Sequence, residues 1–291
     1  MIPRRFINLM MKDLRVGGSY WLSRMSPEKN LFYASVGEAV ESATRMPLYA
    51  SASELSSPKF RFKSSRALDS TFAFMPFYGV DAGPSEGRIV VSDSAGHTHL
   101  YDAEDGSGEM LPPTNESSNW HSPISVCVAK DDAMRADALY VMNGRNSTNF
   151  RSLAYRKDDD TNTMAWDWLE LPPPPYVSGK EDPTIQSYTL LQDKRTICFS
   201  SLTVGGGFGT YCFDTDSLEW TKAGSWTLPF VGRALCIPQL HNLYFGFHDS
   251  NDESLVAVEL PSPLGASNAS PKVIHEWPGF GQPDQRNGCE W

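Results

Sequence analysis

The sequence lacks any long apolar run, and this absence narrows where the chain can work. No stretch approaches the roughly 20 consecutive apolar residues that a membrane-spanning helix requires. Residues 1–25 carry Arg4 and Arg5, but neither the apolar core nor the small-residue cleavage site of a signal peptide. We therefore predict a protein of the cytoplasm or the nucleus, without a membrane partner. Because the same segment has several basic residues and few acids, mitochondrial import is the alternative.

Cysteine is also rare. The chain has five, all far apart: Cys127, Cys198, Cys212, Cys236 and Cys289. None belongs to a Cys-x-x-Cys motif, and no histidine pair has zinc-finger spacing, which argues against a structural zinc site. The odd number and low density favour a reducing compartment over a disulfide framework. Cys198 and Cys212 lie in apolar, strand-like runs, so we expect them to be buried as small apolar side chains.

Basic residues are few relative to acids. Lys and Arg number 25 and Asp and Glu 35, which gives a formal net charge of −10 and a pI of about 5.1. Proteins that bind nucleic acid without sequence preference use basic surface to displace counterions from the phosphates. We therefore expect no nucleic-acid partner for this chain.

Helix-forming sequence is scarce, whereas turn residues are abundant. Only Val36–Arg45, rich in Ala and Glu, is a convincing helical candidate. The 21 prolines and 22 glycines favour many short elements joined by turns. The expected strands are Arg88–Ser92, His97–Tyr101, Leu139–Met142, Phe150–Tyr155, Trp166–Leu169, Thr196–Ser200, Thr210–Asp214, Leu243–Phe247, Leu255–Leu260 and Val273–Trp277.

These strands form units that follow the same order. An apolar strand leads through a small-residue turn to a second strand, which ends in an aromatic residue often followed by an acid. A third strand often carries Trp before a Leu-Pro pair. Residues 87–113, 136–175 and 194–229 show this order clearly, and residues 241–280 show it weakly. A repeat of about 50 to 60 residues with about four strands is typical of a β-propeller of the kelch type.

The best-preserved unit contains TVGGGFGTYCFDTDSLEW, residues 203–220. A glycine cluster beside a strand can hold a phosphate, but a phosphate-binding loop needs Lys and a following helix. Strand-like sequence follows here, so we interpret the glycines as a turn between strands. The markers of the repeat across all units are Tyr101, Asp102, Tyr155, Trp168, Gly205, Gly206, Gly207, Phe213, Asp214 and Trp220.

On these motifs the third unit resembles a kelch repeat, with glycines between two strands, the pair Phe213-Asp214, and Trp220. The chain as a whole is similar to a group of uncharacterised plant proteins, abundant in grasses, that are related to F-box-associated kelch proteins. Phrases such as GRIVVSDSAGHTHLYDAEDGSGEMLPP and SWTLPFVGRALCIPQLHNLYFGF carry this resemblance. It implies a propeller-like fold without a known activity. Residues 1–46 do not match the Leu-Pro-rich helical F-box, so the scaffold-docking role is not implied.

We therefore predict an all-β protein, a kelch-like β-propeller of about four to five blades whose closure the sequence leaves open. Residues 1–70 are expected to form an N-terminal segment with one helix and with strands, such as Tyr20–Leu22 and Leu31–Tyr33, that complete the ring. Residues 71–291 are expected to form the propeller repeats.

For function, we predict a non-catalytic module that binds a protein partner through loops on a rigid scaffold. Trp120 and His121 lie in a polar loop and Tyr176 follows four prolines, and aromatic residues on loops supply binding energy at low entropic cost. Packing between blades is the alternative interpretation of each residue. The sequence identifies neither the partner nor the oligomeric state.

Catalytic chemistry has little support in the sequence. His97 and His99 share one strand face, but no third metal ligand is fixed by spacing, and no nucleophile elbow occurs. We expect no catalytic residue, no metal and no cofactor. Two alternatives remain: a propeller enzyme acting on a small molecule or sugar, and the substrate-recognition subunit of a ubiquitin ligase that has no F-box of its own.

Overall fold

The computed structural model describes most of the chain. The described residues are 6–13, 19–27, 35–45, 59–63, 72–77, 87–93, 95–114, 123–129, 137–144, 149–157, 162–177, 184–202, 209–248, 254–261 and 269–278. Strands and turns dominate these residues, which confirms the all-β prediction. The helix α2 (Val36–Arg45) has the bounds expected from the sequence, and two single 3-10 turns, η3 (Pro175–Val177) and η4 (Pro238–Leu240), occur between strands.

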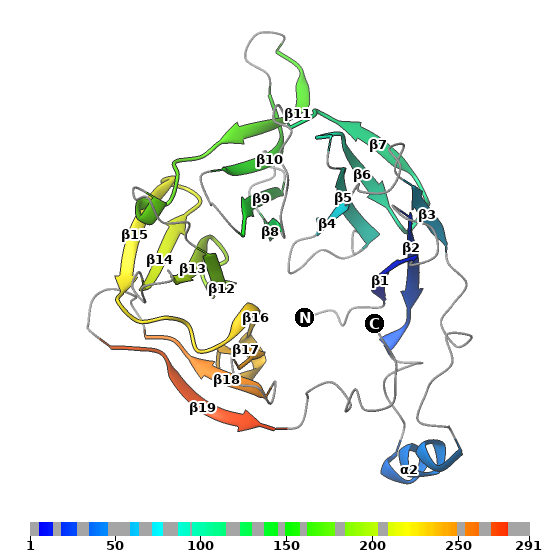
Figure 1. The fold of residues 1–291 in the computed structure, drawn as a ribbon, viewed down its shortest axis with the longest axis vertical. Coiled ribbons are helices and arrows are strands. Elements are labelled where there is room, and N and C mark those ends of the chain that lie inside the picture. Colours follow the sequence, from blue (N-terminus) through cyan, green and yellow to red (C-terminus); the bar gives the residue numbers. More distant parts are fainter. Residues whose placement is uncertain are drawn as a thin grey trace. The chain divides into compact units, whose positions relative to one another are not determined.

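With the exception of β12 and β16, the paired strands are neighbours in sequence (Figure 1). A three-stranded antiparallel sheet comprises β1 (Ile7–Lys12), β2 (Ser19–Met25) and β3 (Phe60–Lys63). A four-stranded antiparallel sheet comprises β4 (Phe72–Pro76), β5 (Arg88–Asp93), β6 (Thr98–Asp102) and β7 (Gly108–Leu111). Another, in the order β11-β10-β9-β8, comprises β8 (Pro123–Val128), β9 (Ala138–Asn143), β10 (Phe150–Lys157) and β11 (Met164–Glu170).

The last sheet has eight strands and consists of two successive meanders. The first meander comprises β12 (Thr184–Leu190), β13 (Thr196–Leu202), β14 (Gly209–Asp214) and β15 (Glu219–Gly224). The second comprises β16 (Val231–Ile237), β17 (Leu243–Phe247), β18 (Leu255–Glu259) and β19 (Lys272–Trp277). A parallel pairing of β12 with β16 joins the two meanders, with Tyr188 in register with Arg233.

The chain divides into two compact units. The first unit comprises residues 1–120, 129–137 and 154–168, and the second comprises residues 121–128, 138–153 and 169–291. Each unit has its own apolar core, as a stable domain requires.

In the first unit, the β1–β3 sheet packs on the β4–β7 sheet. Leu22 is fully buried there among Ile89, Val91 and Tyr101. Arg24 ties the same two sheets together, because its guanidinium donates hydrogen bonds to the Ala103 carbonyl and to the Glu104 carboxylate, both at 3.0 Å. Charge-assisted bonds of this kind offset part of the cost of burying the guanidinium.

In the second unit, aromatic rings form the centre of the core. Phe150, Phe199 and Phe213 are fully buried, and the rings of Phe150 and Phe213 meet edge to face with centroids 4.8 Å apart. Trp220 covers this cluster, at 5.0 Å from Phe213 and 5.5 Å from Phe150. Large rings of this kind remove the most apolar area from water, so they dominate the stability of the unit.

Candidate functional site

The acidic markers of the repeat form turns. Asp102 ends β6, and its Oδ1 accepts the backbone N–H of Glu104 at 2.8 Å. Asp214 ends β14, and its Oδ1 accepts the backbone N–H groups of Asp216 at 2.8 Å and Ser217 at 3.2 Å. An Asx turn is defined by an Asp or Asn side-chain oxygen that accepts a hydrogen bond from the backbone N–H two residues further along the chain. Both acids therefore direct the chain from the second marked strand into the next strand, and their role is structural.

The tryptophan markers also share one interaction. The indole Nε1 of Trp168 donates to the carbonyl oxygen of Pro112 at 3.0 Å, and that of Trp220 donates to the carbonyl oxygen of Pro172 at 2.8 Å. Each acceptor belongs to the Leu-Pro pair that closes the preceding repeat. Proline has no backbone N–H, so it cannot donate to the hydrogen-bond ladder of a sheet and it ends the strand. Its carbonyl oxygen can still accept a hydrogen bond, and it does so from the tryptophan of the next repeat.

The aromatic markers are core residues, with one exception. Tyr101 and Phe213 are buried. Tyr155 is 39% exposed, and its ring lies 5.3 Å from that of Trp166. The glycine markers Gly205, Gly206 and Gly207 lie outside the described residues.

The residues predicted to bind a partner are placed only in part. Trp120 and His121 lie outside the described residues. Tyr176 lies in η3 and is only 4% exposed, with its ring 5.2 Å from that of Tyr211. This position agrees with the packing interpretation of Tyr176, because a buried ring offers little area to a partner. A binding role for all three residues stays a prediction.

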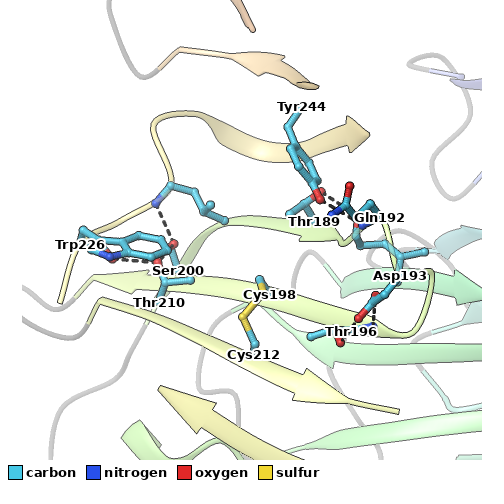
Figure 2. Close-up of a disulfide and its surroundings, with 12 residues drawn as sticks. Thr189, Gln192, Asp193, Thr196, Cys198, Ser200, Thr210, Cys212, Trp226 and Tyr244 are labelled. Carbon is cyan, nitrogen blue, oxygen red and sulfur yellow. Dashed lines mark hydrogen bonds between the residues drawn. A yellow bond between two sulfur atoms is a disulfide. The ribbon is translucent and has the colours of Figure 1, made fainter. Parts of the chain in front are cut away.

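The cysteine prediction was wrong for one pair. Cys198 and Cys212 form a disulfide (Figure 2). They face each other in register on β13 and β14, and both are buried, beside Leu191, Ala223 and Trp226. Burial was predicted correctly, but the strand register adds a covalent bond that low cysteine density had argued against. Cys127 and Cys236 are not disulfide-bonded.

A polar network covers the same face of the sheet. The hydroxyls of Ser200 and Thr210 are 2.7 Å apart, on β13 and β14. Ser200 accepts the backbone N–H of Leu228 at 2.9 Å, and Thr210 donates to the Trp226 carbonyl at 2.8 Å. These bonds, drawn in Figure 2, hold the connection from β15 to β16 against β13 and β14. The network is satisfied internally, so it gives rigidity without offering a reactive hydroxyl.

A second network joins the turn after β12 to β17. The Tyr244 hydroxyl accepts the backbone N–H of Gln192 at 3.1 Å. Burial raises the pKa of the Tyr244 phenol well above its ordinary value and also raises the pKa of the Cys236 thiol beside it. Neither group ionises near neutral pH, so neither is an activated nucleophile or a thiolate ligand.

One face of the β16–β19 meander is apolar and open. The residues in register across the four strands are Val231, Phe247, Leu255 and Trp277. Residues in register on an antiparallel sheet share one face, and Leu235 shares it through its partner Phe245. Leu235 is 45% exposed, Phe247 48% and Trp277 36%. We call this the β16–β19 outer face; the opposite face carries the buried cluster around Phe230 and Tyr244.

The described residues show little that could perform catalysis. Nowhere in the described part of the chain do three or more His, Cys, Asp or Glu side chains gather so as to hold a metal ion. His97 instead contacts Asp93, with 2.9 Å between Nδ1 and Oδ2. Burial alone would raise the pKa of Asp93, but hydrogen bonds from His97 and Ala95 bring it below its ordinary value. This pair shapes the β5–β6 turn.

Among the described helices, none is both long and apolar enough to cross a membrane.

Comparison with known proteins gives a family but no activity. The profile of the family described as "Protein of unknown function (DUF1668)" matches residues 4–290. No curated protein matches the chain significantly.

Similar solved structures include two propeller domains. The WD40 domain of SCAP from fission yeast has 13% identity and a TM-score of 0.39, over 94% of this chain and 56% of that one. The β-propeller domain of Cps50 (Swd1) from Myceliophteria thermophila has 8% identity and a TM-score of 0.40, over 93% and 74%. A Bacteroides thetaiotaomicron protein of unknown function has 10% identity and a TM-score of 0.38, over 89% and 56%. The chain thus spans little more than half of the first and third of these structures.

Proposed function

The chain belongs to the DUF1668 family, and we propose that this member is a kelch-like β-propeller that binds another protein and performs no catalysis of its own. The meanders serve as blades of the propeller, and the β1–β3 sheet contributes a further blade. The proposal includes the relationship to F-box-associated kelch proteins that the sequence motifs imply.

The same side-chain contacts recur in different repeats, and this supports the proposal that the chain is a propeller scaffold. Asp102 and Asp214 form the same turn in different sheets, and Trp168 and Trp220 make the same bond to a Leu-Pro carbonyl. A single repeat unit cannot bury both of its apolar faces, so it is stable only when it packs against the next unit. The same contact between successive units is therefore expected in a repeat fold.

The β16–β19 outer face is the single observation that carries the binding part of the proposal. Leu235, Phe247 and Trp277 expose between about a third and a half of their surface. Large apolar side chains that gather on one face, rather than singly, mark interaction sites. Aromatic residues such as Phe247 and Trp277 dominate the energetics of protein interfaces. A partner with a complementary apolar surface would remove this area from water.

The test compares the proteins captured by tagged wild type with those captured by the double variant Leu235→Ser, Phe247→Ser. Loss of two exposed apolar anchors is expected to weaken capture of the specific partner at least about tenfold. Met110→Ser is the matched control, because Met110 is an exposed apolar residue on a different sheet. Circular dichroism checks that each variant is folded.

The outcomes discriminate clearly. Equal capture by the double variant and the control removes the outer face from the proposal. Capture of no protein by the wild type above an empty-tag background removes the interaction function itself. A third variant, Trp120→Ala, tests the loop predicted from the sequence independently of the outer face.

A further inference from the structure

Arg233 differs from the other arginines whose side chains the structure describes. Each of the others lies within 3.9 Å of a carboxylate: Arg24, Arg61, Arg88, Arg151, Arg156 and Arg195. Arg233 lies half-buried on β16, and across the described residues its guanidinium has no carboxylate partner. Its Nε is buried and makes no hydrogen bond in that part of the chain. Among the arginines whose side chains the structure describes, Arg233 is thus the one without a carboxylate within 4.0 Å.

Tyr188 stands beside Arg233. The two residues are in register on the parallel strands β12 and β16. Adjacent strands lie about 4.8 Å apart, and residues in register point to the same face of the sheet. The phenol and the guanidinium are therefore neighbours on that face. The Tyr188 ring stacks on Phe199, with centroids 6.4 Å apart, which fixes its direction.

The pair presents hydrogen-bond donors. A guanidinium has five N–H groups and no acceptor. Burial raises the pKa of the Tyr188 phenol although the charge of Arg233 opposes this, so the hydroxyl keeps its proton at neutral pH. Within the described residues, no protein group accepts a hydrogen bond from that hydroxyl. Two adjacent donors without a protein acceptor are complementary to an anion.

The backbone leaves this place open. The pairing of β16 with β17 is irregular between Val231 and Leu235, and Gly232, next to Arg233, adopts a left-handed φ of 65°. Gly232 is exposed, and a Cβ there would meet no atom within 4 Å. Arg233 itself is only half-buried, so a small ligand can reach its guanidinium from solvent.

We propose that Arg233 and Tyr188 form a binding site for the oxyanion of a small ligand, a phosphate or a carboxylate group. The guanidinium binds two of its oxygens and the phenol donates to one of them. Partial burial strengthens these bonds relative to an exposed arginine, and the ligand satisfies an Nε that is otherwise costly to bury. Because the chain carries a net charge of −10, binding depends on this local geometry rather than on the long-range field.

The experiment measures the binding of inorganic phosphate and, separately, of acetate to the full chain at constant ionic strength. Thermal shift gives the concentration dependence, and ³¹P line broadening reports phosphate directly. We expect saturable binding of at least one anion. Arg233→Gln should weaken this binding at least about tenfold, and Tyr188→Phe should weaken it severalfold. The stronger of the two probes identifies the chemical group.

Arg195→Gln is the matched control, because Arg195 is an exposed arginine of the same unit that already contacts Asp193, Asp214 and Asp216. It should bind both anions like wild type. If Arg233→Gln fails to fold, Arg233→Lys, which keeps the charge but not the planar fork, should still bind more weakly than wild type. The proposal is overturned if neither anion binds saturably, or if Arg233→Gln and Tyr188→Phe bind like the control.

Discussion

The indole of Trp220 donates a hydrogen bond to the carbonyl oxygen of Pro172, with 2.8 Å between Nε1 and O. The two residues lie 48 positions apart in sequence. The bond joins the outer strand β15 to the segment that follows β11, and the same ring packs on Phe213 and Phe150. Trp168 makes the equivalent bond to Pro112 at 3.0 Å. In both cases a proline that ends one repeat also accepts, through its carbonyl oxygen, the hydrogen bond from the tryptophan of the next repeat.

The first prediction concerns that bond. Trp220→Phe keeps an aromatic ring but removes the donor, and it should lower the free energy of unfolding of the chain by about 1 to 2 kcal/mol, from the lost hydrogen bond and the smaller ring. Trp277→Phe is the control, since Trp277 is exposed and should change stability far less. Urea unfolding followed by circular dichroism measures both. Equal losses in the two variants would mean that the Pro172 bond contributes nothing.

The second prediction concerns the disulfide. Alkylation of the denatured, unreduced protein should label Cys127 and Cys236 but leave Cys198 and Cys212 unlabelled. The double variant Cys198→Ala, Cys212→Ala should lower the free energy of unfolding by about 2 to 3 kcal/mol, the value expected when a loop of this length is no longer closed. Peptide mass spectrometry and urea unfolding are the measurements. Full labelling of Cys198 would show that the bond does not form.

The third prediction concerns the Asx turn at Asp214. Its carboxylate accepts two backbone N–H groups and lies 3.6 Å from the Arg195 guanidinium. Asp214→Ala leaves those N–H groups to water and should cost about 1 kcal/mol of stability. Asp214→Asn, which keeps an acceptor oxygen, should cost clearly less. If the two variants are equally stable, the turn does not depend on the side-chain oxygen.

The fourth prediction concerns alkaline pH. Burial raises the pKa of Tyr244 in the folded state above its unfolded value near 10. Its stabilising contribution is therefore complete below about pH 10 and is lost progressively as the pH rises above that value. Tyr244→Phe should flatten this alkaline decline, although it also loses the Gln192 bond at neutral pH. Stability measured between pH 8 and 11 decides whether the decline flattens.

The sequence predicted well the strands that carry the repeat markers. Leu243–Phe247 was predicted with the bounds of β17, and the other strands expected between residues 88 and 277 overlap β5, β6, β9, β10, β11, β13, β14, β18 and β19. Of the two strands expected nearer the N-terminus, Tyr20–Leu22 overlaps β2, whereas Leu31–Tyr33 lies outside the described residues. Alternating apolar residues and Gly/Asp turns carry that signal. The strands β1, β4, β8, β12 and β16 were missed. In β12, the polar residues Gln186, Ser187 and Thr189 interrupt the apolar pattern that marks a strand. Thr189 is accommodated because its hydroxyl donates a hydrogen bond to the Ala234 carbonyl.

The disulfide and the proposed anion site depend on which residues face each other across paired strands, and amino-acid composition carries no information about this register. Each of Cys198 and Cys212 is the middle residue of a strand that the sequence predicted, so an antiparallel pairing of those strands would have placed them face to face. Arg233 and Tyr188 meet through a parallel pairing of two strands that the sequence did not reveal. Sequence periodicity identifies strands, whereas partners across strands come from the tertiary fold.

Hydrogen–deuterium exchange on the complex with a captured partner tests the proposed binding function most directly. Binding through the β16–β19 outer face should slow exchange in the peptides that contain Val231–Ile237, Leu243–Phe247 and Lys272–Trp277, and leave β5, β6 and β7 unchanged. No change in those three peptides, in a complex whose partner is shown to be bound, would contradict binding at that face.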